Sequence, residues 1–202
     1  MTPTPLLLGT TSAGKLREWQ RLLADLPLRP LGLPDAGVDF DVEETGQTFA
    51  QNAALKADAY GAHSGLLTLA EDSGLAVDAL GGLPGVLSAR WGGADYAVKN
   101  DRLLSLLEGK SGRERACRYV CVAVLRHPDG RTWQARGEVR GQVALAPAGS
   151  GGFGYDPVFT IPRLRATLAQ VSVDEKDRIS HRGRAARRIR QVLRQLVEAS
   201  GG

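Results

Sequence analysis

The chain has 202 residues, of which 43% are hydrophobic, enough to enclose the core of one large domain or of two small ones. Lysine and arginine outnumber aspartate and glutamate by 26 to 22, a modest excess that suits anionic partners. No apolar stretch approaches the ~20 residues of a bilayer span, and the apolar run at residues 6–8 lacks the basic flank of a secretion signal. We therefore expect a cytoplasmic protein without a membrane partner.

The cysteines and histidines do not indicate a metal centre. Cys117 and Cys121 are the only cysteines, and they lie four apart in a predicted strand, where they share one face without meeting as a disulfide. Packing in the core of a protein from a reducing compartment is the expected role. With three histidines in all, a zinc site is not expected.

Charge is unevenly spread along the chain, and this matters more than its total. If the fold brings the early acidic cluster to the late basic one, a single pocket can face both a cation and an anion. The acidic cluster comprises Asp35, Asp39, Asp41, Glu43 and Glu44, and the basic one comprises Arg178, Arg182, Arg184, Arg187, Arg188, Arg190 and Arg194.

The first elements predict a strand, loop and helix unit. Residues 6–8 indicate a buried strand, residues 9–14 a turn, and residues 15–26 a helix with an apolar stripe. Residues 27–37 are rich in proline and glycine and are typical of a connection. Thr48 is the expected N-cap of an alanine-rich helix over residues 49–60.

Strands and helices continue to alternate in the rest of the chain. Residues 66–70 predict a second strand that ends at two carboxylates, and residues 95–107 predict a helix closed by Gly109. Ala116–Arg126 and Thr132–Val143 predict an antiparallel hairpin across a Pro-Asp-Gly turn.

The last segments complete the expected fold. Residues 164–171 fit a short helix or an irregular segment, and Ser180 is expected to cap a final helix over residues 181–198. The chain is therefore expected to have an α/β fold, a mixed central β-sheet flanked by helices, with an antiparallel hairpin portion. The expected domain covers residues 1–202, either undivided or as two lobes around a central cleft.

The pair Glu71-Asp72 is the most informative feature for chemistry. An apolar run leads into these adjacent carboxylates, and Ser73 and Gly74 follow at once. A buried strand delivers acidic side chains to a cleft in this way, where they can hold a divalent cation or polarise a water. An ordinary turn at the end of a strand explains the pair equally well when it is taken alone.

Residues 9–15 match the first seven positions of the phosphate loop G-x-x-x-x-G-K-[ST]. The eighth position is Leu16, which has no hydroxyl for Mg²⁺, and this argues against a true phosphate-loop kinase or ATPase. Hydroxyls, backbone N–H groups and a lysine at a helix start still favour an anion, although an ordinary strand-to-helix turn is the alternative.

A glycine-rich loop over residues 150–157 predicts a second binding element. Its glycines allow close backbone approach, while Phe153 and Tyr155 offer flat faces for a base or sugar. A purely structural role is the alternative, in which the glycines permit an awkward bend and the aromatic side chains pack in the core. Farther on, His181 and Arg182 lie where the last helix is expected to begin, and cations at that helix end favour a nearby anion.

Taken together, these motifs resemble the inosine triphosphate pyrophosphatase family, whose members remove non-standard purine nucleoside triphosphates. The match covers nearly the whole chain in the family's order and spacing. Its most specific blocks are Asp-Ser-Gly-Leu at residues 72–75, Gly-Gly-Phe-Gly-Tyr-Asp-Pro at residues 151–157 and Ser-His-Arg at residues 180–182. Glu-Glu-Thr-Gly at residues 43–46 and the segment over residues 81–90 complete the pattern.

The resemblance implies the family's fold and a Mg²⁺-dependent hydrolysis. The substrates ITP, dITP and XTP would be cleaved between the α and β phosphates, giving the monophosphate and pyrophosphate. Asp72 matches the family's metal ligand and proton acceptor, and Glu43 matches a second acidic position for Mg²⁺. A bound cation would neutralise the phosphates while a carboxylate orients the attacking water.

The resemblance also implies which residues bind the nucleotide. Phe153 would stack on the purine, which an arginine donor would read through the 6-oxo acceptor that adenine lacks. The residues implied to cradle the triphosphate are Thr10, Thr11, Ser12, Ala13, Gly14 and Lys15. Lys56 and Lys176 would add positive charge, and Ser73 would touch the substrate beside the metal. The implied base contacts are Phe153, Gly154, Tyr155, Asp156, His181 and Arg182.

Three positions depart from the family pattern. Ser12 stands where the family usually has Asn, Glu71 replaces a more frequent Asp, and Trp91 replaces another aromatic residue. The extra methylene of Glu71 could shift metal geometry. The family is commonly dimeric, so a homodimer is implied, and no nucleic-acid partner is expected.

Two other functions remain open. The related fold of the Maf proteins, which act on modified pyrimidine nucleotides, is disfavoured by Phe153 and by the Ser-His-Arg block. A nucleotide- or nucleic-acid-binding module could use the arginine-rich last helix, but it would have no need of Asp72.

Overall fold

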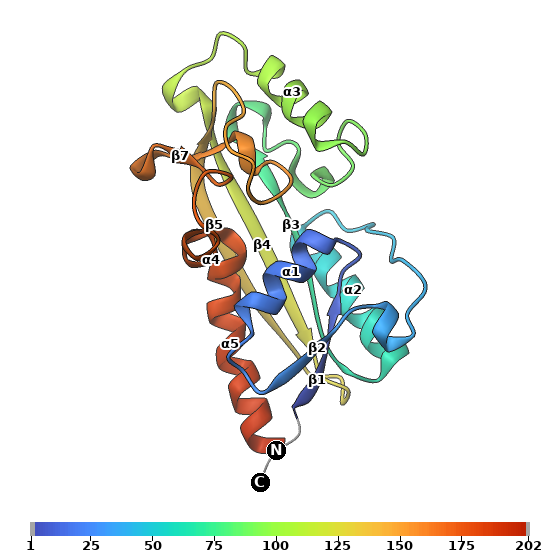
Figure 1. The fold of residues 1–202 in the computed structure, drawn as a ribbon. Coiled ribbons are helices and arrows are strands. Elements are labelled where there is room, and N and C mark those ends of the chain that lie inside the picture. Colours follow the sequence, from blue (N-terminus) through green and yellow to red (C-terminus); the bar gives the residue numbers. More distant parts are fainter. Residues whose placement is uncertain (1–2, 201–202) are drawn as a thin grey trace. The chain divides into compact units, whose positions relative to one another are not determined.

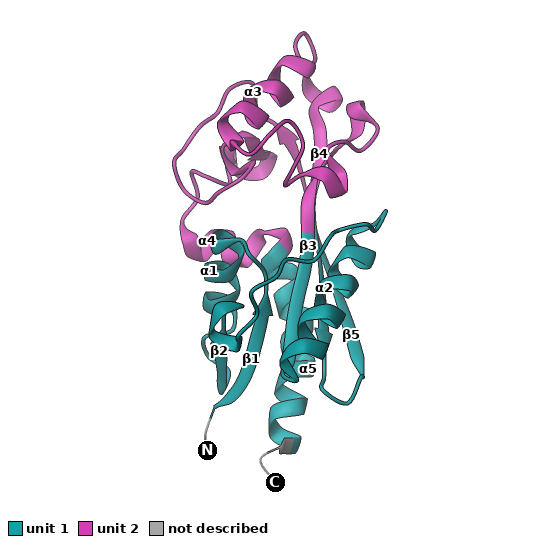
Figure 2. Ribbon diagram, turned by 90° about the vertical axis from the view of Figure 1, so that its right-hand side faces the viewer, with its two compact units in different colours: residues 1–72, 121–137, 182–202 teal, residues 73–120, 138–181 magenta. Residues whose placement is uncertain are grey.

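A computed structural model describes residues 3–200, so residues 1–2 and 201–202 of the expected domain lie outside the described part. The chain packs into two compact units, coloured separately in Figure 2. Unit 1 comprises residues 1–72, 121–137 and 182–202, and unit 2 comprises residues 73–120 and 138–181. Strands β3, β4 and β5 each contribute residues to both units.

The strands form the mixed sheet that the sequence predicts (Figure 1). Their hydrogen-bonded order is β2-β1-β3-β4-β5-β6-β7. β1 pairs in parallel with β2 and β3, whereas β6 pairs antiparallel with β5 and β7. The strands are β1 (Thr4–Gly9), β2 (Leu28–Leu31), β3 (Leu67–Val77), β4 (Ala116–Arg126), β5 (Thr132–Val143), β6 (Phe159–Ile161) and β7 (Ala166–Thr167).

Unit 1 buries both faces of β1. Leu6 and Leu8 join a core with Trp19 of α1 (Ala13–Leu22), to which α5 (His181–Ser200) adds Ala185, Ala186, Ile189 and Leu193. Leu7 points to the other face and packs with Tyr60 of α2 (Phe49–Ser64). Because side chains alternate along a strand, helices cover both faces of this part of the sheet.

Unit 2 has its own core. α3 (Tyr96–Leu106) contributes Leu103, and α4 (Val173–Ile179) contributes Ile179. The strands and loops add Leu75, Val77, Cys117, Tyr119, Val139, Val143, Tyr155, Val158, Phe159, Ile161 and Leu168. Cys117 and Cys121 are both buried and free, as predicted. None of the described helices is both long enough and apolar enough to span a bilayer.

Two strand predictions were wrong. Residues 28–31 form β2 within the predicted connection, because β2 lies at the edge of the sheet, where Pro30 removes no needed donor. β3 does not end at the carboxylates but continues to Val77. Glu71 and Asp72 therefore lie inside a strand rather than at its end.

The helices agree better with prediction. Thr48 caps α2 through a capping box with Gln51, and Asp95 caps α3. α1 ends at Leu22, four residues before the predicted end. Residues 164–171 contain the end of a 3₁₀ turn and the two-residue strand β7, and α4 was not predicted. Ser180 is the C-cap of α4, directly before α5 begins.

Candidate active site

Glu71 and Asp72 contact different sets of residues because they are neighbours in one strand. Consecutive side chains of a strand point to opposite faces of the sheet. Glu71 contacts Trp19 of α1 and Arg182 of α5, whereas Asp72 contacts Asn52 and Lys56 of α2. The acidic pair that the sequence presents as one feature is thereby divided into two sites.

Glu71 is the centre of a buried ionic network in unit 1. Its Oε2 accepts hydrogen bonds from Trp19 Nε1 at 3.1 Å, Cys121 Sγ at 3.0 Å and Arg182 Nε at 2.8 Å. Its Oε1 accepts from Arg182 Nη2 at 2.8 Å and lies 3.2 Å from Lys15 Nζ. Arg182 Nη1 also pairs with Glu18 of α1.

This network keeps Glu71 charged. Burial alone would raise the pKa of Glu71, but the cations of Arg182 and Lys15 hold it well below its usual range. Burial likewise opposes the charge on Lys15, yet the Glu71 carboxylate raises the pKa of Lys15 above its usual value. Removing one member would therefore leave an uncompensated charge inside unit 1.

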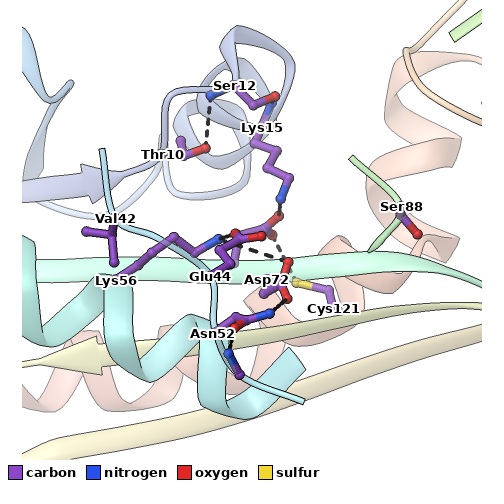
Figure 3. A network of polar contacts seen from close by, with 12 residues as sticks. Thr10, Ser12, Lys15, Val42, Glu44, Asn52, Lys56, Asp72, Ser88 and Cys121 are labelled. Carbon is purple, nitrogen blue, oxygen red and sulfur yellow. Dashed lines mark hydrogen bonds and ion pairs between the residues drawn. The ribbon is translucent and has the colours of Figure 1, made fainter. Parts of the chain in front are cut away.

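Asp72 lies in a different environment, drawn in Figure 3. Its Oδ2 accepts a hydrogen bond from Asn52 Nδ2 at 3.0 Å, and its Oδ1 lies 4.0 Å from Lys56 Nζ. Lys56 Nζ also pairs with Glu44, so the ammonium lies between two carboxylates. Burial raises the pKa of Asp72, an effect that Lys56 and Lys15 oppose. A carboxylate with a raised pKa is a stronger base than an ordinary aspartate.

The donor set around Asp72 fits a magnesium ion that also binds phosphate. Mg²⁺ typically uses one or two protein carboxylates and completes its shell with waters and substrate oxygens. Residues 3–200 contain no group of three or more His, Cys, Asp or Glu side chains arranged to hold a metal, but they bring Glu44 and Asp72 to one ammonium. The position of Lys56 shows that positive charge is favoured between them.

Glu44 rather than Glu43 is the acidic side chain that the structure brings to Asp72. Glu44 is partly buried and its charge acts on Asp72, whereas Glu43 is exposed. The assignment of Glu43 as a metal ligand stays a prediction, whereas the adjacent Glu44 is the glutamate that shares the Lys56 ammonium with Asp72. Two consecutive glutamates carry no signal in sequence that distinguishes them.

The predicted phosphate loop forms a capped helix start in unit 1. Ser12 is the N-cap of α1 and its Oγ accepts from Lys15 N at 3.4 Å, while Thr10 Oγ1 accepts from Ser12 N at 3.1 Å. Thr11 and Ala13 are exposed, and Gly14 is partly buried. Capping hydroxyls, the cavity that residues 10–13 line and the N-terminus of a ten-residue helix make this loop suitable for an anion.

The predicted purine loop is held together inside unit 2. Phe153 N donates to Asp156 Oδ2 at 2.8 Å, and Lys176 of α4 contacts the same oxygen at 2.5 Å. The Lys176 ammonium lies 5.0 Å from the centroid of the Phe153 ring. Three residues that the resemblance assigns to the nucleotide are therefore mutual contacts.

Gly152 shows why the loop needs glycine. Its φ is +71°, and a Cβ there would lie 2.1 Å from Asp156 Oδ2 and 2.8 Å from Lys176 Nζ. A side chain would thus be both strained and in collision with the Asp156 and Lys176 pair. Glycine at this position is required by the contact that organises the loop.

Further contacts hold the same loop from its other side. Gly154 O accepts from Asn100 Nδ2 of α3 at 3.3 Å, and Tyr155 N donates to Tyr119 Oη at 3.2 Å. The Tyr119 ring stacks on His181, with centroids 4.3 Å apart and planes within 3°. His181 is thereby placed beside the loop within unit 2, and Ser73 is a partly buried residue of the same unit.

Arg182 has a role that the sequence does not reveal. The side chain is 1% exposed and its guanidinium is paired with Glu71 and Glu18. Its predicted contact with the purine ring stays a prediction. The contacts present in the structure are those of a residue that organises the buried charges of unit 1.

Comparison with known proteins identifies the chain's relatives. The model of the Ham1 family matches residues 6–192. This chain belongs to the Ham1 family. A curated relative from Gloeobacter violaceus, named dITP/XTP pyrophosphatase, is 47% identical over 184 residues, 91% of each chain. A relative of the same name from Streptomyces avermitilis is 45% identical and covers 96% of this chain and 99% of its own.

Solved structures agree with this assignment. The HAM1 protein from Coxiella burnetii is 36% identical, with a TM-score of 0.85 over 95% of this chain and 99% of that one. The Ham1 protein of Staphylococcus aureus is 35% identical, with a TM-score of 0.82 over 98% and 100%. The predicted family relationship and fold are therefore confirmed.

Several residues of this Ham1 chain were missed as site components by sequence reasoning. No role was predicted for Asn52, Tyr119, Asn100 or Glu18. Asn52 and Lys56 lie four apart on a helix that is otherwise rich in alanine, and this spacing is the one available signal. Tyr119, Asn100 and Glu18 are identified only by their contacts with residues far away in the sequence.

Proposed function

We propose that the chain is a Mg²⁺-dependent nucleoside triphosphate pyrophosphatase that hydrolyses dITP, ITP and XTP to the monophosphate and pyrophosphate. The observation that carries the proposal is the buried Asp72 carboxylate, held by Asn52 and sharing the Lys56 ammonium with Glu44. The names of the Gloeobacter and Streptomyces relatives support the same substrates.

Asp72 would accept a proton from the attacking water. Its raised pKa, caused by burial, makes the ionised carboxylate a better proton acceptor, and the Asn52 amide fixes its orientation. The water oxygen forms a bond to the α-phosphorus as the bond from that phosphorus to the bridging oxygen breaks. Pyrophosphate leaves with the bridging oxygen, and the nucleoside monophosphate remains.

Asp72 and Glu44 would hold the magnesium ion. When bound, Mg²⁺ supplies charge neutralisation for the phosphate oxygens. Lys56, which lies between these carboxylates, would donate to a phosphate oxygen of the substrate. Glu44 rather than Glu43 is proposed because its side chain shares Lys56 with Asp72.

The capped loop over residues 10–15 would bind the triphosphate. Its N–H groups and the N-terminus of α1 favour negative charge, and Lys15 adds an ammonium held by Glu71. Because Lys15 is already paired, its position is set before substrate arrives. Such preorganisation lowers the cost of ordering the site on binding.

The loop of unit 2 would bind the base. Phe153 offers a face for stacking, and the Lys176 ammonium beside it is a hydrogen-bond donor. A donor there suits the 6-oxo group of hypoxanthine and xanthine and disfavours the amino group of adenine. This contact supports selection against ATP.

A substrate panel tests the proposal. Purified wild type and Asp72→Asn would be incubated with Mg²⁺ and ITP, dITP, XTP, GTP, ATP or modified pyrimidine triphosphates, and pyrophosphate measured separately from orthophosphate. We expect pyrophosphate from the first three substrates, lost in the variant. Orthophosphate as the sole product, or full activity of Asp72→Asn, would contradict the proposal. Selective cleavage of pyrimidine nucleotides would favour a Maf-like activity, and binding without cleavage a binding module.

The proposal includes a cytoplasmic homodimer. Two free cysteines are typical of a reducing compartment and support the location, while the homodimer rests on the family resemblance alone. Light scattering coupled to size-exclusion chromatography would measure the assembly directly.

A further inference from the structure

A stripe of buried polar residues runs along one face of α2. Asn52, Lys56 and Tyr60 follow each other at intervals of four residues, so they share a face of the helix. They are 0%, 7% and 0% exposed, respectively. Polar groups buried this deeply need partners, and their partners show what the stripe does.

All three residues contact one irregular segment, residues 38–46, which we call the acidic strap. Tyr60 Oη donates to Asp41 Oδ1 at 2.9 Å, Lys56 pairs with Glu44, and Asn52 Oδ1 accepts from Gly46 N at 2.8 Å. The order of contacts along the helix is the reverse of the order along the strap. The strap therefore runs antiparallel to α2 and is attached at successive turns.

Val38 and Val42 pack part of the strap into a cluster with Leu7 and Leu33, but its acidic side chains depend on polar contacts. The strap contains no helix or strand, and most of its side chains are exposed. Asp39, Phe40 and Asp41 also line a cavity of about 470 Å³ together with the loop over residues 10–13. Because that side is open, the positions of Asp41 and Glu44 depend on the contacts with α2 in addition to the packing of Val38 and Val42.

Gly46 and Asn52 show how closely the strap is fitted. A Cβ on Gly46 would lie 2.6 Å from Asn52 Oδ1, so only glycine permits this approach. Asn52 uses both ends of its amide, since Nδ2 donates to Asp72 while Oδ1 accepts from the strap. A single side chain thus connects the strap to β3.

We propose that Asn52 and Tyr60 are positioning residues that hold the acidic strap against β3, so that Glu44 and Asp72 present their carboxylates to one divalent cation. The inference rests on the proposed function, because it assigns these residues to the cation site of that reaction. Tyr60 acts through the strap alone, whereas Asn52 acts both through the strap and through its hydrogen bond to Asp72.

The test measures cation binding separately from catalysis. Mn²⁺ would be titrated into the full chain and free Mn²⁺ followed by electron paramagnetic resonance, with the Mg²⁺ concentration for half-maximal ITP hydrolysis as a second readout. Tyr60→Phe keeps the ring that packs with Leu7 and Val38 and removes the hydroxyl. We expect Mn²⁺ affinity to fall about three- to tenfold, the effect of one hydrogen bond, with kcat at saturating Mg²⁺ nearly retained.

Two comparisons make the result specific. Asp41→Ala should weaken Mn²⁺ binding by a similar factor, and adding Tyr60→Phe to it should cause no further loss, because both remove the same bond. Ser64→Ala is the matched control, since its hydroxyl donates to Tyr60 O at 2.8 Å on the same helix without touching the strap. That variant should bind Mn²⁺ as wild type does. Asn52→Ala should weaken binding more than Tyr60→Phe.

Every other outcome overturns the inference. Wild-type Mn²⁺ affinity in Tyr60→Phe, or an equal loss in Ser64→Ala, would show that the stripe supports folding alone. Additive losses in the double variant would show that Tyr60 and Asp41 act independently. Failure of the wild type itself to bind Mn²⁺ or to release pyrophosphate would reject the proposed function, and the positioning role with it.

Discussion

The guanidinium of Arg182 donates two parallel hydrogen bonds to the carboxylate of Glu71, from Nε and Nη2, each at 2.8 Å. The two residues are 111 positions apart in sequence, and both are buried in unit 1. This fork geometry fixes Glu71 with both oxygens occupied. The strand alternation turns Glu71 away from Asp72, and the fork keeps it in the structural network.

Glu71→Gln should destabilise unit 1 strongly. The amide keeps the size of the side chain but leaves Arg182 without its main counter-charge, and breaking a buried ion pair in this way costs about 3–5 kcal/mol. Urea denaturation followed by Trp fluorescence would measure the loss. Asp78→Asn removes the exposed pair with Arg118, where the two side chains are 58% and 39% exposed, and should cost less than about 1 kcal/mol. Equal losses in the two variants would contradict the role of Glu71.

The stability of unit 1 should fall in acid because of Glu71. Its folded-state pKa is depressed below the ordinary value of 4.5, so its contribution is present above that pH and is lost as the pH falls through the folded pKa. Denaturation midpoints measured from pH 6 downward should decline below about pH 4.5, and Glu71→Gln should flatten this decline. An unchanged slope in the variant would assign the acid sensitivity to other groups.

Asp72→Asn should abolish activity while leaving the fold as stable as wild type or more so. The pKa of Asp72 is raised, so its ionisation opposes folding above the ordinary value of 3.8 and has no effect well below it. The stability gain of the variant should therefore grow as the pH rises from 3.8 through the folded pKa. Thermal melts at pH 3 and pH 7 would measure this gain. A gain confined to the lower pH would show that ionisation of Asp72 does not oppose folding.

Phe153→Leu should weaken substrate binding with a smaller effect on turnover. The aromatic face is the proposed stacking surface, and base stacking contributes about 1–3 kcal/mol, so KM for ITP should rise about five- to a hundredfold. Steady-state kinetics would separate KM from kcat. Phe153→Tyr keeps the aromatic face and should behave as wild type, and a similar KM in both variants would exclude stacking.

Gly152→Ala should disrupt the loop of unit 2 more than positive φ alone can explain. Gly130→Ala is the matched control, because Gly130 also has a positive φ, +92°, but its added Cβ would meet nothing within 4 Å. Both variants should lose about 1–2 kcal/mol from left-handed strain. Gly152→Ala should additionally raise KM for ITP, because its Cβ displaces Asp156 and Lys176. Equal KM values would show that the Asp156–Lys176 contact does not organise the base site.

Local signals in the sequence predicted much of the fold. The antiparallel pair Ala116–Arg126 and Thr132–Val143 has the predicted bounds, and Thr48 caps its helix, because turn and capping chemistry depend on neighbouring residues. The strand over residues 28–31 was missed because Pro30 is acceptable only at a sheet edge, and strand order is not a local property.

The candidate site shows the same difference between features set by local sequence and features set by long-range contacts. Motif order and spacing were sufficient to predict family membership, which is confirmed, because they depend on residue types in short segments. The roles of Asp72 and of the two loops stay predictions. Only the tertiary structure decided that Glu71 and Asp72 face different partners, that Glu44 rather than Glu43 lies by Lys56, and that Arg182 is paired within unit 1. Those outcomes depend on how the strand continues and which distant helices cover each face, and no local pattern encodes either.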